Sequence, residues 1–305
     1  MTGLNALPAR TSLSSWWAGA RPRTLAIGVM PVLVGAAASG HPTVPRTVAA
    51  LIVALGLQVG ANYANDYFDG VRGVDTEQRV GPMRLVASGT ASPRAVLSAA
   101  AASLSVAGVV GVALCIATGQ LQLLGLGALA VLAAVLYTGG PRPYAGIGVA
   151  DIAVFLFFGL LAVTGTVAVE IGHTTKAGWW AAVPVGLLAV GVLVANNLRD
   201  VRTDAEAGRK TLIVRIGLDR GRRLYQGVVG APFIVTTIGV IAGGLPAATL
   251  ITLIVLPLVV RPIALAGHGE GRQLVPVLIA TAKLHLAFSL ALTVGLVAAG
   301  LTGRL

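Results

Sequence analysis

The chain carries long apolar stretches whose length matches that of a helix crossing a lipid bilayer. A spanning helix needs about 20 mainly apolar residues, and a soluble domain carries about 25% charged residues. Here only 11% of the 305 residues are charged and 56% are hydrophobic. We therefore predict an all-α multi-pass membrane protein. The nine candidate transmembrane helices are 24–40, 47–64, 94–117, 120–137, 147–169, 179–198, 224–243, 245–265 and 275–300.

The basic residues are distributed unevenly along this predicted topology. Most of the 22 Lys and Arg residues fall in the N-terminal lead-in 1–23 and in every second connecting segment, including the long loops 65–93 and 199–223. Because basic loops stay in the cytoplasm, we expect a cell-membrane protein with a cytoplasmic N-terminus and an external C-terminus. The net charge of +11 then reflects orientation in the membrane, so no nucleic-acid partner is expected.

Two similar polar stretches stand at the start of these two long loops. Asn65–Asp69 reads Asn-Asp-Tyr-Phe-Asp, and Asn196–Asp200 reads Asn-Asn-Leu-Arg-Asp. A further acid follows each one, Asp75 in the first loop and Asp204 in the second. Four predicted helices separate them, which indicates two four-helix repeats with one helix added, in a single domain. Parallel repeats of membrane proteins often form a site where they meet, so we expect the two stretches to face each other.

The acids of the two stretches are spaced as metal ligands would be. On a helix Asp66 and Asp69 share a face, and so do Asp200 and Asp204. Such carboxylates repel unless a cation neutralises them, and Mg²⁺ takes carboxylate oxygens while leaving positions for phosphate oxygens. We therefore expect two Mg²⁺ ions with a diphosphate between them. The predicted metal ligands are Asp66, Asp69, Asp75, Asp200 and Asp204.

Simpler interpretations exist for individual residues. A single Asn-Asp run at a helix end usually caps the helix, and Asp151 could be such a cap. Arg209 and Lys210 could serve only to set the topology, and aromatic residues near the first stretch could be interface anchors. Glu170, the only acid on the predicted external side, is expected to be solvated. The recurrence of the acidic stretches at matching positions favours a functional site over capping.

The two stretches resemble the motifs of the UbiA superfamily of intramembrane prenyltransferases. The first family motif, Asn-x-x-x-Asp-x-x-x-Asp, begins with Asn65 and Asp69, and the second, Asp-x-x-x-Asp, is Asp200 and Asp204. The third acid of the first motif is displaced, because Gly73 stands in its place. The resemblance covers essentially the whole chain and implies the UbiA-like fold.

The longer spacing between Asp69 and the displaced acid, Asp75, resembles the pattern of one branch of that superfamily, the MenA branch in its actinobacterial form. Asp75 is followed by Arg79-x-Gly-Pro-x-Arg84, and the second stretch by Lys210-Thr-Leu. A further element, Tyr-Thr-Gly-Gly-Pro-x-Pro-Tyr, ends at Tyr144 before the fifth predicted helix. This branch consists of 1,4-dihydroxy-2-naphthoate polyprenyltransferases, so a Mg²⁺-dependent enzyme of menaquinone synthesis is implied.

The resemblance implies a reaction and a set of roles. A polyprenyl group passes from polyprenyl diphosphate to 1,4-dihydroxy-2-naphthoate, with loss of CO₂ and diphosphate, to give demethylmenaquinol. The implied catalytic residues are Asp69, Asp200, Lys210 and Arg84. The implied diphosphate-binding residues are Asn65, Asn196, Asn197, Arg79, Arg84, Arg142 and Lys210. The aromatic walls for the prenyl cation and the acceptor are Tyr67, Phe68, Tyr137 and Tyr144.

Two alternatives remain at this point. A sibling enzyme could prenylate another aromatic or sugar-phosphate acceptor, because few residues determine which acceptor binds. A membrane transporter would also carry intramembrane charges and broken helices. All 11 acids except Glu170 lie on the predicted cytoplasmic side, which leaves an alternating-access path little to use and favours the enzyme.

Overall fold

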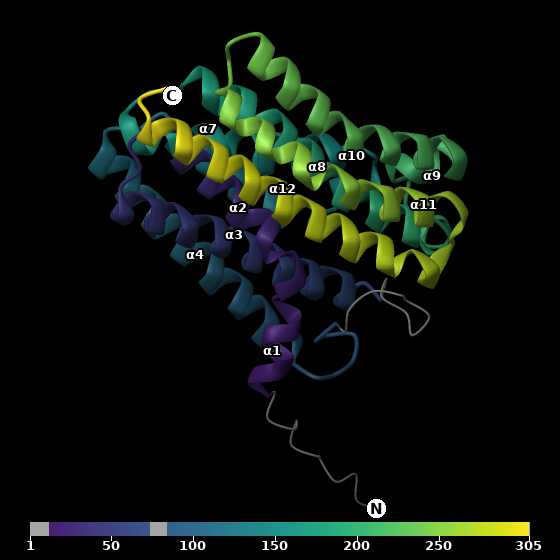
Figure 1. Cartoon of the computed structure of the whole chain (residues 1–305). Coiled ribbons are helices and arrows are strands. Elements are labelled where there is room, and N and C mark those ends of the chain that lie inside the picture. Colours follow the sequence, from purple (N-terminus) through teal and green to yellow (C-terminus); the bar gives the residue numbers. More distant parts are fainter. Residues whose placement is uncertain (1–11, 74–83, 305) are drawn as a thin grey trace, which may run out of the picture.

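The computed structural model describes residues 12–73 and 84–304, and the regular structure within these residues is entirely helical (Figure 1). A short helix, α1, leads into the first half of the bundle. The elements of this half are α1 (Leu13–Gly19), α2 (Pro22–Ala38), α3 (Val44–Val71), α4 (Pro93–Thr118) and α5 (Leu123–Leu136). The predicted all-α class is confirmed.

The second part begins with a single-turn 3₁₀ helix, η1 (Tyr144–Gly146), and a helix with a π-helical middle. That helix comprises α6 (Ala150–Val154), η2 (Phe155–Leu161) and α7 (Ala162–Ile171). The remaining elements are α8 (Lys176–Glu206), α9 (Leu212–Ile216), α10 (Leu218–Ile241), η3 (Ala247–Val259), α11 (Val260–His268), η4 (Gly271–Leu274) and α12 (Val275–Leu301).

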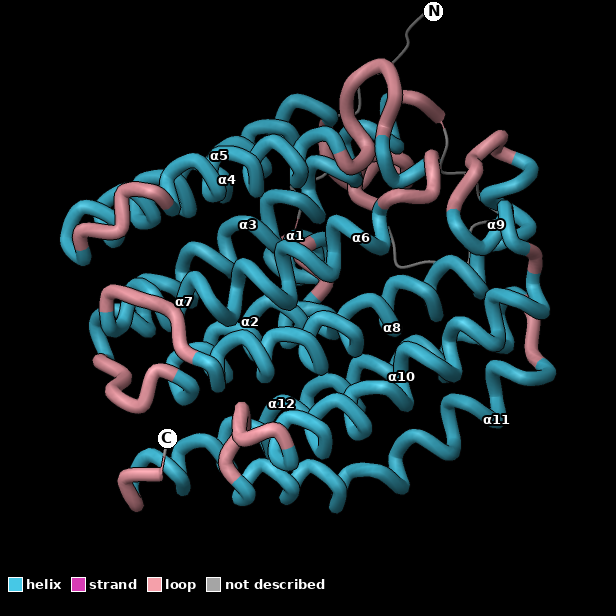
Figure 2. The backbone as a smooth tube through the Cα atoms, turned by 90° about the horizontal axis from the view of Figure 1, so that it is seen from above, coloured by secondary structure: helices cyan, strands magenta, loops and turns pink. Residues whose placement is uncertain are grey.

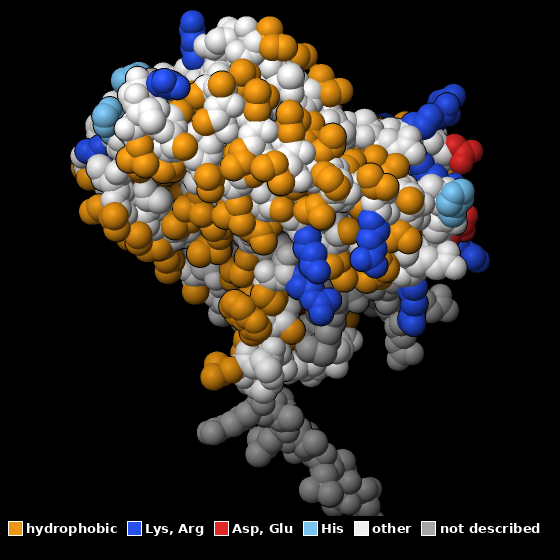
Figure 3. Space-filling view, viewed as in Figure 1, with side chains coloured by type: hydrophobic (Ala, Val, Ile, Leu, Met, Phe, Trp, Pro, Cys, Tyr) orange, Lys and Arg blue, Asp and Glu red, His pale blue; other side chains and the backbone are white. Residues whose placement is uncertain are grey.

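Seven of the described helices are long and apolar enough to cross a membrane. The predicted stretches 24–40 and 120–137 correspond to apolar helices of only 17 and 14 residues, α2 and α5. Apolar side chains cover the middle of the molecule, whereas acidic ones gather at the end where α9 lies (Figure 3). The chain is therefore an integral membrane protein whose acids concentrate at one end of the bundle.

Helices α3 and α8 are longer than a bilayer requires. They contain 28 and 31 residues, and at about 1.5 Å per residue each exceeds the roughly 30 Å of hydrocarbon. Both polar stretches therefore lie on the last turns of a helix and not in loops, which corrects the expected loop starts at 65 and 199. A helical frame fixes the side chains of these stretches more rigidly than a loop would.

Helix α2 lies in the centre of the bundle, in contact with α3, α7, α8 and α12. Figure 2 shows α4 and α5 along one side of the molecule and α10 and α11 along the other. Small residues allow the close approach: a Cβ at Gly35 of α2 would stand 2.4 Å from the carbonyl oxygen of Val163. This central packing brings the ends of α3 and α8 together across α2.

Glu170 corrects one expectation, because its side chain is buried and not solvated. It is 2% exposed at the end of α7. Its carboxylate accepts hydrogen bonds from the Thr43 amide at 2.8 Å, the Thr43 hydroxyl at 2.9 Å and the Thr47 hydroxyl at 2.6 Å. Arg46 also donates to the carbonyl oxygen of Glu170. The acid thus joins α7 to the first turn of α3, where negative charge is favourable.

Replacing Glu170 with Ala is expected to lower the free energy of unfolding by about 3 kcal/mol, because three donors lose a charged acceptor. The measurement is thermal unfolding of the purified protein in detergent, followed by circular dichroism. Glu206→Ala is the control, since the Glu206 side chain is 58% exposed and pairs with the exposed Arg202. Equal effects of the two substitutions would contradict the structural role of Glu170.

Candidate active site

The C-terminal ends of α3 and α8 meet, and the acids of both helices are buried there. Asp69 is 3% exposed, Asp200 is 9% exposed and Asp204 is 8% exposed. A carboxylate removed from water is unfavourable unless it is paired, so the partners of these three acids define the site.

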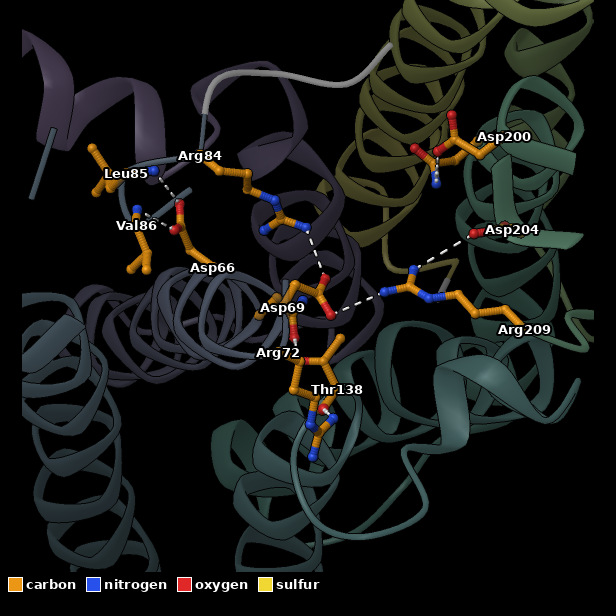
Figure 4. Close-up of polar contacts among 12 residues, drawn as sticks. Asp66, Asp69, Arg72, Arg84, Leu85, Val86, Thr138, Asp200, Asp204 and Arg209 are labelled. Carbon is orange, nitrogen blue, oxygen red and sulfur yellow. Dashed lines mark hydrogen bonds and ion pairs between the residues drawn. The ribbon is translucent and has the colours of Figure 1, made fainter. Parts of the chain in front are cut away.

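Asp69 lies between two arginines (Figure 4). Arg84 Nη2 is 3.2 Å from one carboxylate oxygen, and Arg209 Nη2 is 3.0 Å from the other. Arg209 also reaches Asp204 of α8 at 3.5 Å. The guanidinium group of Arg209 therefore bridges the first polar stretch and the second, which are brought together as expected.

The burial of Arg84 matters for its charge. Burial lowers the pKa of Arg84 below its ordinary value, while the carboxylates of Asp69 and Asp66 raise it; nearby Arg209 adds to the lowering and Tyr137 opposes it. A buried guanidinium depends on its acidic neighbours. The carboxylates of Asp69 and Asp66 therefore counteract the effect of burial on Arg84.

Asp200 forms a second polar group with its neighbours on α8. The Nε of Arg199 donates to Asp200 at 2.7 Å, and its Nη2 donates to the amide oxygen of Asn196 at 2.8 Å. The Asn196 amide donates in turn to Asp200 at 3.4 Å. Arg199 is only 4% exposed, so the second stretch carries its own buried cation.

These groups surround a polar cavity of about 70 Å³. The lining side chains come from the ends of α3 and α8, the start of α2, the segment before α4, and the segments after α5 and α8. They are Arg21, Asn65, Asp69, Arg84, Tyr137, Thr138, Ala145, Asn196, Asn197, Arg199, Asp200, Asp204, Arg209 and Thr211.

Asp66 does not face this cavity, in contrast to the expectation that it joins Asp69 as a metal ligand. Its carboxylate accepts hydrogen bonds from the backbone amides of Leu85 at 2.8 Å and Val86 at 2.9 Å. Figure 4 shows it turned away from Asp69. It is 1% exposed. Asp66 therefore holds the turn that begins at Arg84.

Other predicted residues divide between the cavity and its surroundings. Asn65 and Asn197 line the cavity, and the Asn65 side-chain oxygen accepts a hydrogen bond from Thr138 at 2.8 Å. The side chains of Arg142 and Lys210 are exposed and do not line it. The predicted ligand Asp75 and the predicted phosphate donor Arg79 lie outside the described residues.

Of the four predicted aromatic walls, only Tyr137 lines the cavity. Tyr144 stands behind it, with ring centroids 5.3 Å apart in an edge-to-face contact. Burial raises the pKa of Tyr144, so this phenol stays neutral. Tyr67 and Phe68 contact each other at 5.1 Å, and the guanidinium of Arg72 lies 5.8 Å from the Phe68 ring centre.

Several cavity residues were not predicted from the sequence. The sequence pattern allows Arg209 to serve only as a topology signal, and it predicts no site role for Arg21, Arg199 and Thr138. Arg21 adopts φ 59°, the only described residue other than glycine with positive φ. That left-handed conformation costs a side-chain-bearing residue about 1–2 kcal/mol, and such strain tends to occur at functional sites.

The acids are not clustered as a ready metal site. Within residues 12–73 and 84–304, no three Asp, Glu, His or Cys side chains lie close enough together to hold a metal ion. Arginines stand between the carboxylates instead. The cavity thus combines acidic and amide oxygens from two helix ends with cationic groups able to contact an anion bidentately.

Comparison with known proteins agrees with this arrangement. The model of the UbiA prenyltransferase family matches residues 28–271. A 1,4-dihydroxy-2-naphthoate octaprenyltransferase of Mycobacterium tuberculosis is 42% identical over 284 residues, which cover 92% of this chain and 96% of that protein. The enzyme of the same name from Escherichia coli is 37% identical over 219 residues, covering 69% and 71%.

Solved structures share the fold. The apo structure of a UbiA homolog from Aeropyrum pernix K1 has a TM-score of 0.69 at 18% identity, covering 90% of this chain and 97% of that one. A UbiA homolog from Archaeoglobus fulgidus bound to DMAPP and Mg²⁺ has a TM-score of 0.64 at 18% identity, covering 92% and 99%. This chain belongs to the UbiA prenyltransferase family.

Proposed function

We propose that this protein transfers a polyprenyl group from polyprenyl diphosphate to 1,4-dihydroxy-2-naphthoate, with loss of CO₂ and diphosphate, in menaquinone biosynthesis. The observation that carries the proposal is the cavity in which Asp69 of α3 and Asp204 of α8 share Arg209. Two acidic helix ends and several guanidinium groups around one cavity suit a dianionic group and its counterions. The mycobacterial relative, which has 42% identity and carries this activity in its name, supports the same acceptor.

The donor set fits Mg²⁺. Carboxylate and amide oxygens are the hard ligands this ion prefers, and the cavity presents them from both stretches through Asp69, Asp200, Asp204 and Asn197. A cation already bridges Asp69 and Asp204 in the form of Arg209, so the position between them accommodates positive charge. We propose two ions, one at each stretch. Held by these residues, Mg²⁺ would supply positive charge to the leaving diphosphate.

The chain's own cations have a defined task in this scheme. Arg84 and Arg209 both contact Asp69, and either can exchange that carboxylate for a phosphate oxygen once the acid has another counterion. Arg199 stays fixed by Asp200 and Asn196 and contributes charge to the cavity wall. These preorganised cations stabilise charge that develops on the leaving group. Lys210 and Arg142, which are exposed, are assigned to the approach of the substrate.

The allylic cation requires a wall that is electron-rich and dry. The ring of Tyr137 lines the cavity, and Tyr144 supports it from behind. A neutral phenol ring presents a π face to a cation. We assign Tyr137 to this contact, with Tyr144 as the residue that fixes the orientation of the ring.

We also propose the number of membrane crossings, the repeat organisation and the orientation of the chain. Helices α2 and α5, with 17 and 14 residues, are about 26 and 21 Å long, shorter than the roughly 30 Å of hydrocarbon. We propose that both cross the membrane together with their adjoining residues, which makes nine crossings with the seven longer helices. They form two four-helix units plus one within a single domain, 1–305. We propose a cytoplasmic N-terminus and site and an external C-terminus, because basic residues surround the acidic stretches and basic loops stay in the cytoplasm.

Substituting Asp69 or Asp200 with Asn is expected to reduce prenyl transfer at least about 100-fold, because charge stabilisation of the leaving group is lost. The assay follows product formed from radiolabelled prenyl diphosphate in membranes that contain the variant at wild-type abundance. Asp219→Asn provides the control, since this side chain is 89% exposed at the start of α10. Near-normal turnover in either site variant would contradict the two-metal proposal.

Arg209→Gln is expected to lower kcat/KM for prenyl diphosphate about 100-fold, because a charge-assisted contact to the diphosphate is removed. The matched control is Arg202→Gln, whose parent side chain is 89% exposed. Steady-state kinetics on the detergent-purified protein would measure both variants. If they behaved alike, Arg209 would have to be assigned to topology alone.

A further inference from the structure

Asp151, at the start of α6, is a buried acid without a role in the diphosphate site. It is 8% exposed. Neither of its carboxylate oxygens has a hydrogen-bond partner within residues 12–73 and 84–304. It is also not the helix cap that the sequence allowed, because the N-cap position is Val149 and no side chain caps this helix. A buried carboxylate without a donor is unfavourable, so the position is suited to a ligand that brings one.

The helix frame puts Asp151 on the inward side of α6. Val154 follows it by three residues and therefore shares its face. Val154 packs against a buried apolar cluster that contains Ile27 of α2, Ala189 and Val192 of α8, and Ala282 of α12. We call Ile27, Val154, Ala189 and Val192 the floor, an apolar layer next to the cavity whose residues do not line it. Asp151 stands about one helical turn above the floor, toward the acidic end of the bundle.

A residue of α8 stands at the same height above the floor as Asp151. Asn196, which lines the cavity, follows Val192 of the floor by four residues and so stands one turn above it. Tyr137 lines the cavity as well. Just before Asp151 in the chain, Ala145 lines the cavity and Gly146 accepts a hydrogen bond from the Lys210 amide at 2.8 Å. Asp151 therefore follows a segment that lines the cavity and stands between that segment and the floor.

We propose that Asp151 binds the hydroxyl group of the aromatic acceptor that neighbours its carboxylate, and takes the proton of that hydroxyl during transfer. The inference rests on the proposed function and adds an acceptor subsite to it. A phenolic hydroxyl supplies the hydrogen bond that Asp151 lacks, and the floor offers an apolar surface for the aromatic ring. The diphosphate cations lie on the opposite side of the acceptor, beyond the allylic carbon.

The step balances in atoms and electrons. The ring carbon that carries the carboxylate attacks the allylic carbon, and the bond from that carbon to the diphosphate oxygen breaks with its electron pair. The neighbouring hydroxyl becomes a carbonyl as its proton moves to Asp151. The product is a β-keto acid, which loses CO₂ and leaves an enolate. The enolate oxygen recovers the proton from Asp151, restoring the aromatic diol and the carboxylate.

The test compares Asp151→Asn and Asp151→Glu with the wild-type protein in detergent. General-base contributions are about 10²–10⁴-fold, so Asp151→Asn should lower kcat about 100-fold. Its KM for prenyl diphosphate, and the affinity for prenyl diphosphate measured without acceptor, should stay within about twofold. Asp151→Glu should recover at least tenfold of the lost kcat, because it restores the base. Asp219→Asn, a matched change at an exposed acid, should leave all these values unchanged.

Other results would overturn the inference. A kcat for Asp151→Asn within threefold of wild type contradicts the proton transfer. Removal of an unpaired buried charge should leave thermal unfolding at or above the wild-type temperature, so strong destabilisation by Asn would show a structural role instead. Wild-type protein that makes no prenylated naphthoate contradicts the proposed function itself, a failure distinct from loss of the effect at Asp151.

Discussion

The pairing of Asp69 with two arginines is the interaction on which the site depends. A carboxylate that is 3% exposed needs compensating charge, and Arg84 and Arg209 provide it from two different segments of the chain. Since Arg209 also contacts Asp204, one guanidinium holds the end of α3 to the end of α8. Removal of either arginine would leave buried negative charge between the helices. The electrostatics that would bind a diphosphate are the same electrostatics that hold the two helix ends together.

The position of Arg84 is set by a second acid, Asp66. It accepts the amides of Leu85 and Val86 and so holds the turn that starts at Arg84. Three residues along α3, Asp69 then receives the side chain of Arg84. Asp66 thus positions the backbone of the segment, and Asp69 forms an ion pair with the guanidinium group of Arg84. Asp66 and Asp69 are both almost fully buried, but Asp66 accepts backbone amides whereas Asp69 pairs with arginine side chains.

The sequence predicted the helices and the meeting of the two stretches, because apolar length and the recurrence of Asn65–Asp69 at Asn196–Asp200 are local signals. It could not separate Asp66 from Asp69. The two lie about 60° apart on the helix, and the choice between them depends on the segment that folds back from Arg84, a tertiary contact. The role of Arg209 could not be predicted either, since a basic residue after a helix has the same sequence pattern whether it orients the protein or pairs with a buried acid. Glu170 was misjudged for a related reason, because its partners Thr43 and Thr47 are distant in the chain.

The position of the cavity in the bundle relates the chemistry to the membrane. Its polar walls occupy the last turns of α3 and α8, which extend past the length that the hydrocarbon requires. Below them lies an apolar layer that includes Val154 and Val192. A substrate with a charged head and an isoprenoid tail matches this order of surroundings, with the head among arginines and the tail toward the lipid. Because the reacting carbon joins head to tail, it would fall at the boundary between the two layers, and Tyr137 lines the cavity near that boundary.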